Sequence, residues 1–542
     1  MKDKFFKSGE CWVWFNAGAI AIALVMVIGL VLLIAARGLS HFWPSEITIY
    51  EVQLEDGSKQ LSMGEEYGEE LPKGGDPIAD KQILLKVGNR ELYGLDFRWL
   101  KNKNVVKTEL ATDVVVIERR EWGNFYGFLE QVEFDGQVFT QNDEDVLLAK
   151  MHEAIDRANE LHEKARDLEK DDIGAINYDL EELRLERRRL ELKDEDTPEV
   201  LAEIASQEKE LREKFEVVQA ELFKLHEQAK RDTVSLVTID DKRVNIVAEN
   251  IVMAFKPNEM SFLQKLGHYF LKAGEFVSDE PREANTEGGV FPAIFGTVLM
   301  VLLMSVMVTP FGVVAAVYLH EYAKQGFLTR LIRIAVNNLA GVPSIVYGVF
   351  GLGFFVYFLG GSIDDLFYPE AKPAPTFGTS GLMWASITLA LLTLPVVIVS
   401  TEEGLSRIPK SIREGSLALG ATKIETLWRT VLPMASPAMM TGLILAIARA
   451  AGEVAPLMLV GVVKLAPTLP LDANAPFLHL DRKFMHLGFH IYDVGFQSPN
   501  VEAARPLVYA TAFLLVLVII LLNISAIKIR NRLREKFKSL EN

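Results

Sequence analysis

Cysteine is almost absent from this chain of 542 residues. The single cysteine, Cys11, excludes a disulfide within the chain, so every folded part must be held together by packing. An excess of positive charge is also missing, and the net charge of −16 argues against nucleic acid as a partner. No G-x-x-x-x-G-K-[ST] motif and no His/Cys cluster with metal-ligand spacing occurs. We therefore expect no enzyme activity, no bound cofactor and no metal site in this chain.

Long apolar runs are what the chain does have, although 24% of its residues are charged. A positive mean hydropathy beside so many charges indicates that membrane segments and charged soluble segments are separated along the chain. Runs of about 20 apolar residues predict helices that cross a bilayer. The six candidates are Trp12–Ala36, Phe291–Tyr318, Leu331–Leu359, Met383–Ser400, Met434–Val463 and Leu507–Ile527.

Basic residues predict how these spans are oriented, because Lys and Arg are enriched on cytoplasmic flanks. The tail 528–542 after the last span is basic and is therefore expected in the cytoplasm; it carries Lys528, Arg530, Arg532, Arg534, Lys536 and Lys538. Six spans then place the N-terminus inside too, in agreement with Lys2, Lys4 and Lys7. The first span is too long for a signal-peptide core and lacks a clear cleavage site, so we expect it to be retained.

The residues divide into four predicted parts. Residues 1–43 hold the N-terminal end and the first span, and residues 44–290 form a charged insertion on the outer side. Residues 291–527 hold spans two to six, with a cytoplasmic loop at about 401–433, and residues 528–542 form the basic tail. The predicted fold is mainly α: a six-helix membrane core plus an α+β domain outside.

Within the insertion, β-rich segments flank a helical region. Strands are predicted at Ile47–Leu54, Asp113–Ile117, Val132–Phe139 (with a hairpin turn at Asp135-Gly136), Val234–Ile239 and Val244–Val247. Between about 143 and 230, apolar residues recur at helical steps and predict three helices forming a hairpin or coiled coil. Asp171–Gly174 is expected to end the first helix, and Thr197-Pro198 to start the third. A solvated stalk and a docking arm for another protein are both compatible with this pattern.

Residues 261–277 alternate apolar and polar side chains at helical period just before span two. Two interpretations remain open: a helix lying in the outer membrane interface, and an ordinary amphipathic helix of the external domain.

The loop between spans four and five carries the most specific motif. It reads Glu414-Gly-Ser-Leu-Ala-Leu-Gly420, followed thirteen residues later by Pro433. We expect two short helices, Ile412–Leu419 and Lys423–Thr430, with Gly420 making the turn between them and Pro433 ending the second. The apolar side chains of this segment suit a groove on a partner protein. The candidate contact residues are Glu414, Gly415, Ser416, Leu417, Ala418, Gly420 and Pro433, with Arg413 beside Glu414 fixing the register.

Charged residues inside span five are the candidates for a transport path. Arg449 and Glu453 are four residues apart, so each can neutralise the other on one helix face. A charge within a bilayer costs at least ~2.5–3.5 kcal/mol and normally faces protein or water. A structural ion pair and an anion-binding arginine held by its glutamate both fit this spacing.

Span three is interrupted by Pro343 and by several glycines, Gly348 among them. A broken span is tolerated only where protein or a cavity satisfies the freed backbone carbonyls. Ser344 and Asn337 are the candidates for that role. Tight helix packing explains the motif most simply, and a gate is the alternative.

Four segments together resemble the phosphate-specific ABC importer permeases, the PstA type most of all. They are Gly288–Gly296, Ala340–Gly348, the loop motif Glu414–Pro433 and Ile447–Leu457, whose Ala-Pro-Leu ending is typical of PstA. In the family pattern E-A-A-x3-G of the loop, Gly415 and Ser416 replace the two alanines. The resemblance covers about 288–527 and, loosely, span one; it leaves out the insertion.

The resemblance implies a subunit of a phosphate importer in the bacterial inner membrane. The partners it implies are a second permease (PstC-like), an ABC ATPase dimer (PstB-like) that uses ATP, and a periplasmic phosphate-binding protein (PstS-like). It assigns the loop motif to the ATPase contact, and Arg449 and Glu453 to the phosphate path. Two alternatives remain: another oxyanion or small solute as substrate, and a scaffold or sensor acting through the external coiled coil.

Overall fold

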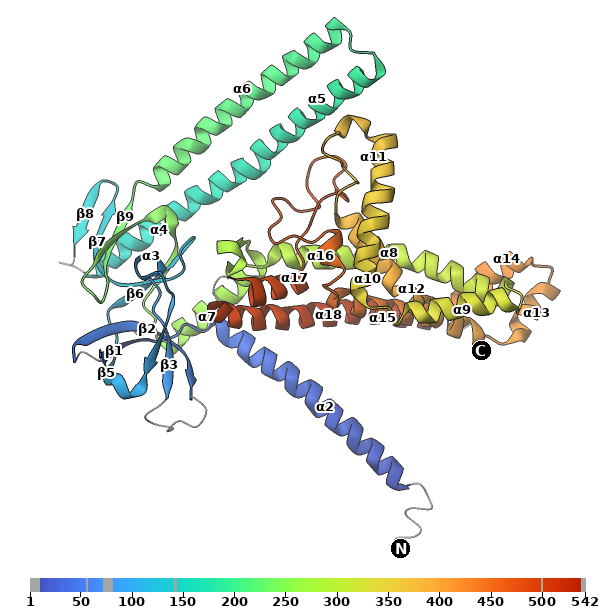
Figure 1. The fold of residues 1–542 in the computed structure, drawn as a ribbon, viewed down its shortest axis with the longest axis horizontal. Coiled ribbons are helices and arrows are strands. Elements are labelled where there is room, and N and C mark those ends of the chain that lie inside the picture. Colours follow the sequence, from blue (N-terminus) through green and yellow to red (C-terminus); the bar gives the residue numbers. More distant parts are fainter. Residues whose placement is uncertain (1–9, 55–56, 72–80, 141–143, 499–500, 538–542) are drawn as a thin grey trace.

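The computed structural model describes residues 10–54, 57–71, 81–140, 144–498 and 501–537. A bundle of long helices and a separate strand-rich part are joined at one end of the bundle, where α7 lies (Figure 1). The basic residues Lys2, Lys4, Lys7 and Lys538, on which the orientation argument drew, lie outside the described residues.

Six helices in the described part are long and apolar enough to cross a membrane, as the sequence predicted. They begin and end at Trp12–Phe42, Phe291–Tyr322, Ser344–Phe367, Leu382–Ser406, Lys423–Gly452 and Ala504–Glu535. Two predicted spans are wrong in extent. The third begins at Ser344 rather than Leu331, because Pro343 separates it from the amphipathic helix α9 (Phe327–Leu339). The fifth ends at Gly452 rather than Val463, and a short helix, α16 (Leu457–Val460), follows.

The centre of the bundle is α12 (Leu382–Ser406), which is buried along most of its length. It packs against α8 (Phe291–Val317) on one side and α15 (Leu432–Gly452) on another, and α15 packs against α18 (Val501–Phe537). Met300, Leu389 and Ala450 are among the fully buried side chains that join α8, α12 and α15 into one core. This core fixes the ends of the helices that carry the loop motif.

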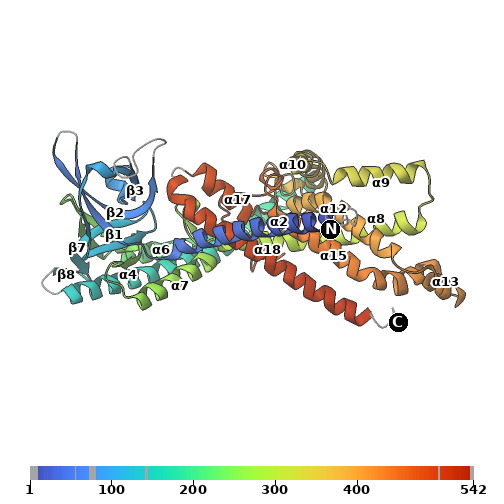
Figure 2. The same cartoon turned by 90° about the horizontal axis from the view of Figure 1, so that it is seen from below.

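The first span, α2 (Glu10–Leu39), leaves the bundle at an angle (Figure 1), and seen from below it crosses in front of the bundle (Figure 2). It touches α18 closely at Gly38, where an added Cβ would lie 2.8 Å from the Tyr509 carbonyl oxygen. Beyond this crossing, the apolar side chains of α2 are exposed within this chain. Such a face requires lipid or another subunit around it.

The described part of the insertion contains two large antiparallel sheets and one of only two short strands. The first has the order β4-β3-β2-β1-β5, formed by β1 (Ile47–Gln53), β2 (Lys59–Glu70), β3 (Gln82–Lys86), β4 (Phe97–Lys101) and β5 (Val105–Leu110). The second has the order β10-β9-β7-β6-β11, formed by β6 (Val114–Arg119), β7 (Phe125–Phe134), β9 (Thr233–Val237), β10 (Arg243–Val247) and β11 (Ile251–Phe255). The short β8 (Gln137–Thr140) pairs with β7 through Asp135-Gly136, both with positive φ, which confirms the predicted hairpin turn.

The helical region of the insertion is a hairpin of two long arms rather than three helices. The predicted break at Asp171–Gly174 is wrong: α4 (Glu144–Asp167) runs through a π-helical segment, Leu168–Ile173, into α5 (Gly174–Lys193). The π turn absorbs the Asp171-Asp-Ile-Gly174 sequence without ending the helix. The predicted start of α6 (Pro198–Ala229) after Thr197 is confirmed. The arms lie side by side and antiparallel (Figure 1); heptad packing between them stays a prediction.

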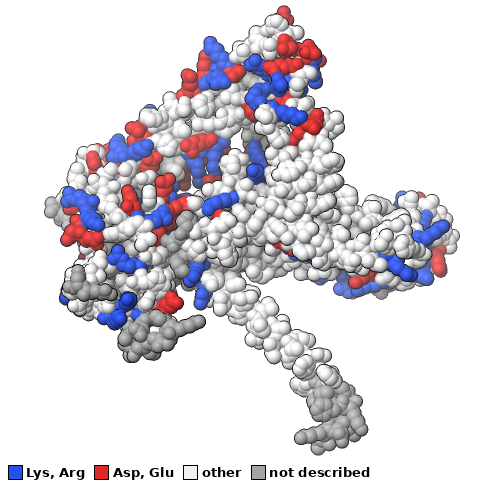
Figure 3. All heavy atoms as spheres, in the orientation of Figure 1, with Lys and Arg blue, Asp and Glu red and all other residues white. Residues whose placement is uncertain are grey.

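The helical hairpin reaches back to the membrane core. Arg189 on α5 pairs with Glu370 at 2.9 Å, in the loop after the third span. The Tyr178 hydroxyl donates to the Ala475 carbonyl oxygen at 2.5 Å, in the loop after the fifth span. Lys, Arg, Asp and Glu cover the visible hairpin and sheets, whereas the visible face of the bundle is largely free of them (Figure 3). The hairpin therefore bridges two loops of the core, those after the third and fifth spans, from a charged domain.

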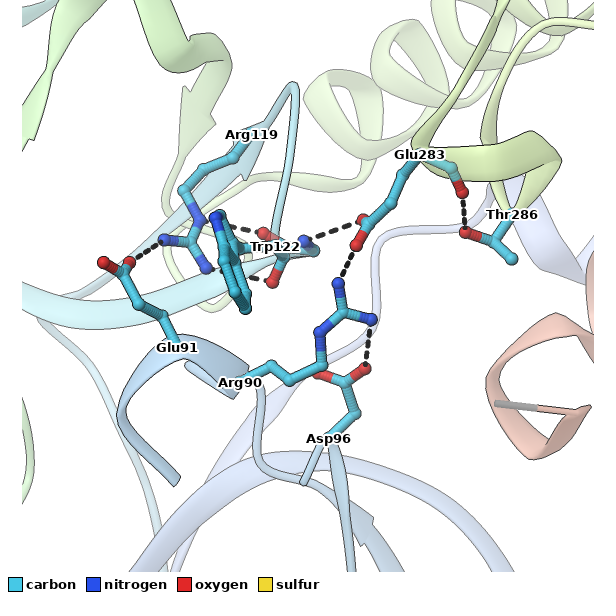
Figure 4. Close-up of polar contacts among 8 residues, drawn as sticks. Arg90, Glu91, Asp96, Arg119, Trp122, Glu283 and Thr286 are labelled. Carbon is cyan, nitrogen blue, oxygen red and sulfur yellow. Dashed lines mark hydrogen bonds and ion pairs between the residues drawn. The ribbon is translucent and has the colours of Figure 1, made fainter. Parts of the chain in front are cut away.

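A second junction ties the sheets to the segment before α8. Arg90, on the short helix α3 (Arg90–Tyr93), pairs with Glu283 and lies 3.7 Å from Asp96 (Figure 4). Glu283 also accepts the Gly123 backbone N–H at 2.9 Å. Glu283 precedes the two-residue strand β13 (Glu287–Gly288), which pairs with β12 (Pro281–Arg282). Ion pairs therefore fix the sheets to the segment that leads into α8, in addition to the two covalent connections between the insertion and the membrane core.

Candidate coupling loop and transport path

The loop motif forms a helix, a tight turn and a second helix. The first helix, α13 (Lys410–Ala418), ends at Gly420, which has a φ of +89°. The Gly420 N–H donates to the Leu417 carbonyl and the Ala421 N–H to the Ser416 carbonyl, at 3.0 and 3.3 Å. This pair of bonds is a Schellman helix end, which favours glycine at the left-handed position. The predicted turn at Gly420 is therefore confirmed.

The second helix begins with a capping box. The Thr422 hydroxyl accepts the Glu425 N–H, and the Glu425 carboxylate accepts the Thr422 N–H, at the start of α14 (Lys423–Thr426). The Ser416 and Thr426 hydroxyls are 2.9 Å apart and join the two helices side by side. Ser416 thus holds the loop's own shape, a role that the motif alone did not indicate.

Arg413 faces the membrane bundle rather than the exposed side of the loop. It donates to the carbonyl oxygens of Leu405 and Ile408, each at 2.8 Å. It also pairs at 3.0 Å with Glu321, which lies in a π-helical segment (Tyr318–Tyr322) at the end of α8. Arg413 therefore ties the loop to spans two and four, and only Glu414 remains exposed for the register role expected of both residues.

An apolar surface covers the exposed side of the loop. Leu419 is 90% exposed, and Leu417 lies beside it in sequence. Ile424, on the second helix, and Trp428, in the π-helical segment Leu427–Val431 that follows it, are 70% and 74% exposed and extend this surface. The sequence prediction missed these two, because it assigned the contact to the first helix, to Gly420 and to Pro433. Ile424 and Trp428 are four residues apart, a spacing that places them on one helix face and was readable in the sequence.

Pro433 does not end the second helix, contrary to the prediction. A π-helical segment, Leu427–Val431, follows α14 and leads directly into α15, where Pro433 occupies the first turn. Proline is tolerated in the first turn of a helix because its missing N–H would be unpaired there anyway. The wider π turn connects the loop to span five as one continuous helix.

Arg449 and Glu453 lie where α15 ends. The Arg449 Nε is 3.6 Å from the Glu453 Oε1, and both side chains are partly exposed. Glu453 is the C-cap residue, after which the chain turns away in an extended conformation. The structure therefore brings the two predicted path residues together as an ion pair at a helix end. Arginine near the C-terminus of a helix is also stabilised by the helix dipole.

The residues around Pro343 hold the start of span three. Pro343 is the N-cap of α10 (Ser344–Phe350), and the Tyr347 hydroxyl donates to the Leu339 carbonyl at 2.6 Å. Tyr347, rather than Ser344 or Asn337, thus satisfies a carbonyl at the break. A Cβ on Gly348 would lie 2.7 Å from the Pro456 Cα, so the absence of a side chain lets span three approach the segment after Glu453.

A cleft of about 460 Å³ opens between α9, α12 and α15. Glu403 and Arg407 line one end of it, close to the loop motif, and Thr441 and Leu445 line its α15 side. Arg449 follows Leu445 by four residues and so continues the same helix face. Arg449 therefore lies one helical turn beyond the cleft, which neither it nor Glu453 lines. The described residues hold no group of three or more His, Cys, Asp or Glu side chains arranged for a metal ion.

Comparison with known proteins follows the same division of the chain. Residues 308–537 match the family described as binding-protein-dependent transport system inner membrane component. The phosphate transport system permease protein PstA 1 of Mycobacterium tuberculosis (strain CDC 1551 / Oshkosh) is 34% identical over 244 residues, 45% of this chain and 71% of that protein. PstA of Yersinia pestis is 33% identical over 251 residues, 46% of this chain and 75% of that protein. The probable ABC transporter permease YqgH of Bacillus subtilis (strain 168) is 33% identical over 193 residues, 35% of this chain and 59% of that protein.

Proposed function

Because the chain belongs to the inner-membrane components of binding-protein-dependent ABC transport systems, and among them to the PstA type, we propose that it is the permease subunit of an ATP-driven phosphate importer. The observation that carries this proposal is a loop of the family pattern, folded as a helix–turn–helix beside a cleft that ends one helical turn before a membrane arginine. The substrate is inferred from the relatives named as phosphate permeases.

The loop is the proposed contact with a separate ATPase. Leu417, Leu419, Ile424 and Trp428 supply an apolar surface, and Glu414 lies exposed beside it. Such a surface suits a groove in a partner, with the charged residue fixing the register. Movement of the ATPase reaches span five through the continuous helix and spans two and four through Arg413. The other candidate contact residues of the loop, Gly415, Ser416, Ala418 and Gly420, shape this contact or lie within it.

Phosphate is proposed to pass Arg449. A guanidinium binds phosphate oxygens through two parallel hydrogen bonds, and in a poorly hydrated path such bonds are strong. The ion pair with Glu453 keeps the arginine from being an unpaired charge when no substrate is bound. When phosphate replaces the Glu453 carboxylate, Arg449 stays paired with an anion. Keeping Arg449 paired before phosphate binds is the proposed role of the 3.6 Å contact with Glu453.

Three further partners belong to the proposal. A second permease would cover the exposed faces of the spans, α2 among them. An ATPase dimer would bind the two coupling loops, and a periplasmic binding protein would deliver phosphate on the side of the insertion. Both termini would lie in the cytoplasm, as the basic tail indicates.

Competition for uptake tests the substrate. Cells that carry the chain with its partner subunits should take up radiolabelled phosphate, and unlabelled phosphate should suppress uptake while sulfate and molybdate should not. If sulfate or molybdate suppressed the uptake as well as unlabelled phosphate does, the assignment of phosphate as the substrate would be contradicted. Membrane levels measured by blotting would be compared across all variants.

A further inference from the structure

Helix α7 (Phe262–Ser278) presents its apolar side to the outside of the protein. It begins with a capping box at Ser261, so its start is fixed. Leu263 is 77% and Phe270 is 65% exposed, and both lie on one face. Val277 lies on the same face, and Phe262 and Leu271 lie at its two edges; all three are exposed. A helix on the surface of a water-soluble domain normally has the opposite arrangement, with its apolar face toward the core.

The charged side of α7 faces the protein instead. Lys272 pairs with Glu118 on β6 at 2.5 Å and with Glu275 at 2.7 Å, and Lys265 pairs with Glu46 at 3.3 Å. Both lysine side chains are largely buried. Burial alone would raise the pKa of Glu118, but Lys272 and Arg282 lower it to about 2, so the carboxylate stays charged. These ion pairs hold the helix with its apolar face turned outward.

The ends of two membrane spans fix the level at which α7 lies. Trp43, just after the first span, contacts the rings of Phe262 and Tyr269, with centroids 5.9 and 6.2 Å apart. The Phe276 carbonyl accepts the Val290 N–H at 2.8 Å, directly before the second span. Aromatic side chains such as Trp43 and Tyr269 are typical of the boundary between lipid and water. The exposed face of α7 is therefore continuous with lipid-facing surfaces.

We propose that the apolar face of α7 is embedded in the lipid interface of the outer leaflet and anchors the insertion to the membrane surface. The assignment to the outer leaflet rests on the proposed orientation of the chain, whereas the contact with lipid does not depend on that orientation. An amphipathic helix of this kind sinks its apolar side chains to the level of the headgroups and upper acyl chains. Through Lys272 and Glu118 the anchor fixes β6, and with it the second sheet, at a set height above the bilayer.

Lipid quenching of a fluorescent label tests this proposal. Leu263→Cys and Phe270→Cys would each be made with Cys11→Ser, so that one cysteine carries the label. Phe223→Cys, on the hairpin arm α6, is the matched control, since Phe223 is 68% exposed. The complete complex would be placed in vesicles of phosphatidylethanolamine and phosphatidylglycerol, with and without lipid brominated near the headgroup.

Labels at Leu263 and Phe270 should lose most of their fluorescence in brominated lipid, while the label at Phe223 should lose none. Equal fluorescence in both lipids at all three positions would overturn the proposal. Quenching at Leu263 and Phe270 that appears only when the second permease is left out would also overturn it, because a protein would then cover the face. The readout needs no substrate, so failure of phosphate uptake in the same vesicles would be distinguishable from failure of the lipid contact.

Discussion

Replacing Gly420 by alanine should weaken the contact with the ATPase without harming the rest of the membrane core. The Gly420 φ of +89° lies in the left-handed region, and two hydrogen bonds of the helix end depend on it. A side chain in that conformation costs about 1–2 kcal/mol. At that cost the equilibrium constant for forming the native turn falls ~5–30-fold, and the apparent Kd of the ATPase should rise by up to the same factor.

Gly415→Ala is the control in the same loop. Gly415 lies within α13, and a Cβ added there meets no atom within 4 Å. Alanine is favoured over glycine inside a helix by about 1 kcal/mol, so this variant should bind the ATPase at least as well as the wild type. The measurement is binding of the purified ATPase to the permease complex in detergent. Equal affinities for Gly420→Ala and the wild type would refute the argument, as would an equal loss in both variants.

Three other predictions concern the path, the packing of span three and the junction with the insertion. Arg449→Lys should lower phosphate uptake tenfold or more, because hydrogen bonds to a charged group contribute ~1.5–3 kcal/mol and a lysine cannot make the paired contact. Phosphate uptake by cells with equal membrane levels of the two proteins measures this effect, and uptake by the variant at the wild-type rate would contradict the prediction. Gly348→Ala should lower the stability of the protein by about 1–3 kcal/mol, since the new Cβ would meet the backbone of Pro456. Gly353→Ala should not, because Gly353 has open space around it. Equal melting temperatures of the two variants would refute this argument. Glu118→Gln should destabilise the insertion by ~3–5 kcal/mol at neutral pH, because it removes the buried carboxylate that Lys272 and Arg282 share and leaves Lys272 with Glu275 alone. Since its pKa of about 2 lies below the usual 4.5, this stabilisation is complete above about pH 4.5 and is lost as the pH falls toward 2; protease sensitivity of the insertion against pH measures it, and identical profiles for the variant and the wild type would contradict it.

Much of the membrane core could be predicted from the sequence because a bilayer imposes length and apolarity on each span. The errors fell where helices are interrupted. Pro343, recognised in the sequence as an interruption of span three, divides the predicted span into two separate helices, whereas Pro433 and Gly174 interrupt none, because π-helical turns carry the chain through or past them. Hydropathy and residue type do not reveal such turns, since they depend on neighbouring packing.

The coupling loop shows which part of a site a motif can predict. The turn at Gly420 follows from local backbone chemistry, and its sequence signal is strong. The inward direction of Arg413 depends on Glu321, nearly a hundred residues away in the chain, so no local pattern reveals it. Ile424 and Trp428 were visible at helical spacing, but only exposure on the folded loop marks them as surface residues.

ATP-driven uptake of phosphate into vesicles tests the central claim most directly. The purified complex would be reconstituted with the binding protein and radiolabelled phosphate on the side of the insertion, and with ATP on the side of the coupling loop. The account predicts that phosphate accumulates in the ATP-containing compartment, that it does so only with ATP, and that Arg449→Ala abolishes accumulation. Accumulation without ATP would contradict the account, and so would the absence of accumulation when ATP and every partner are present.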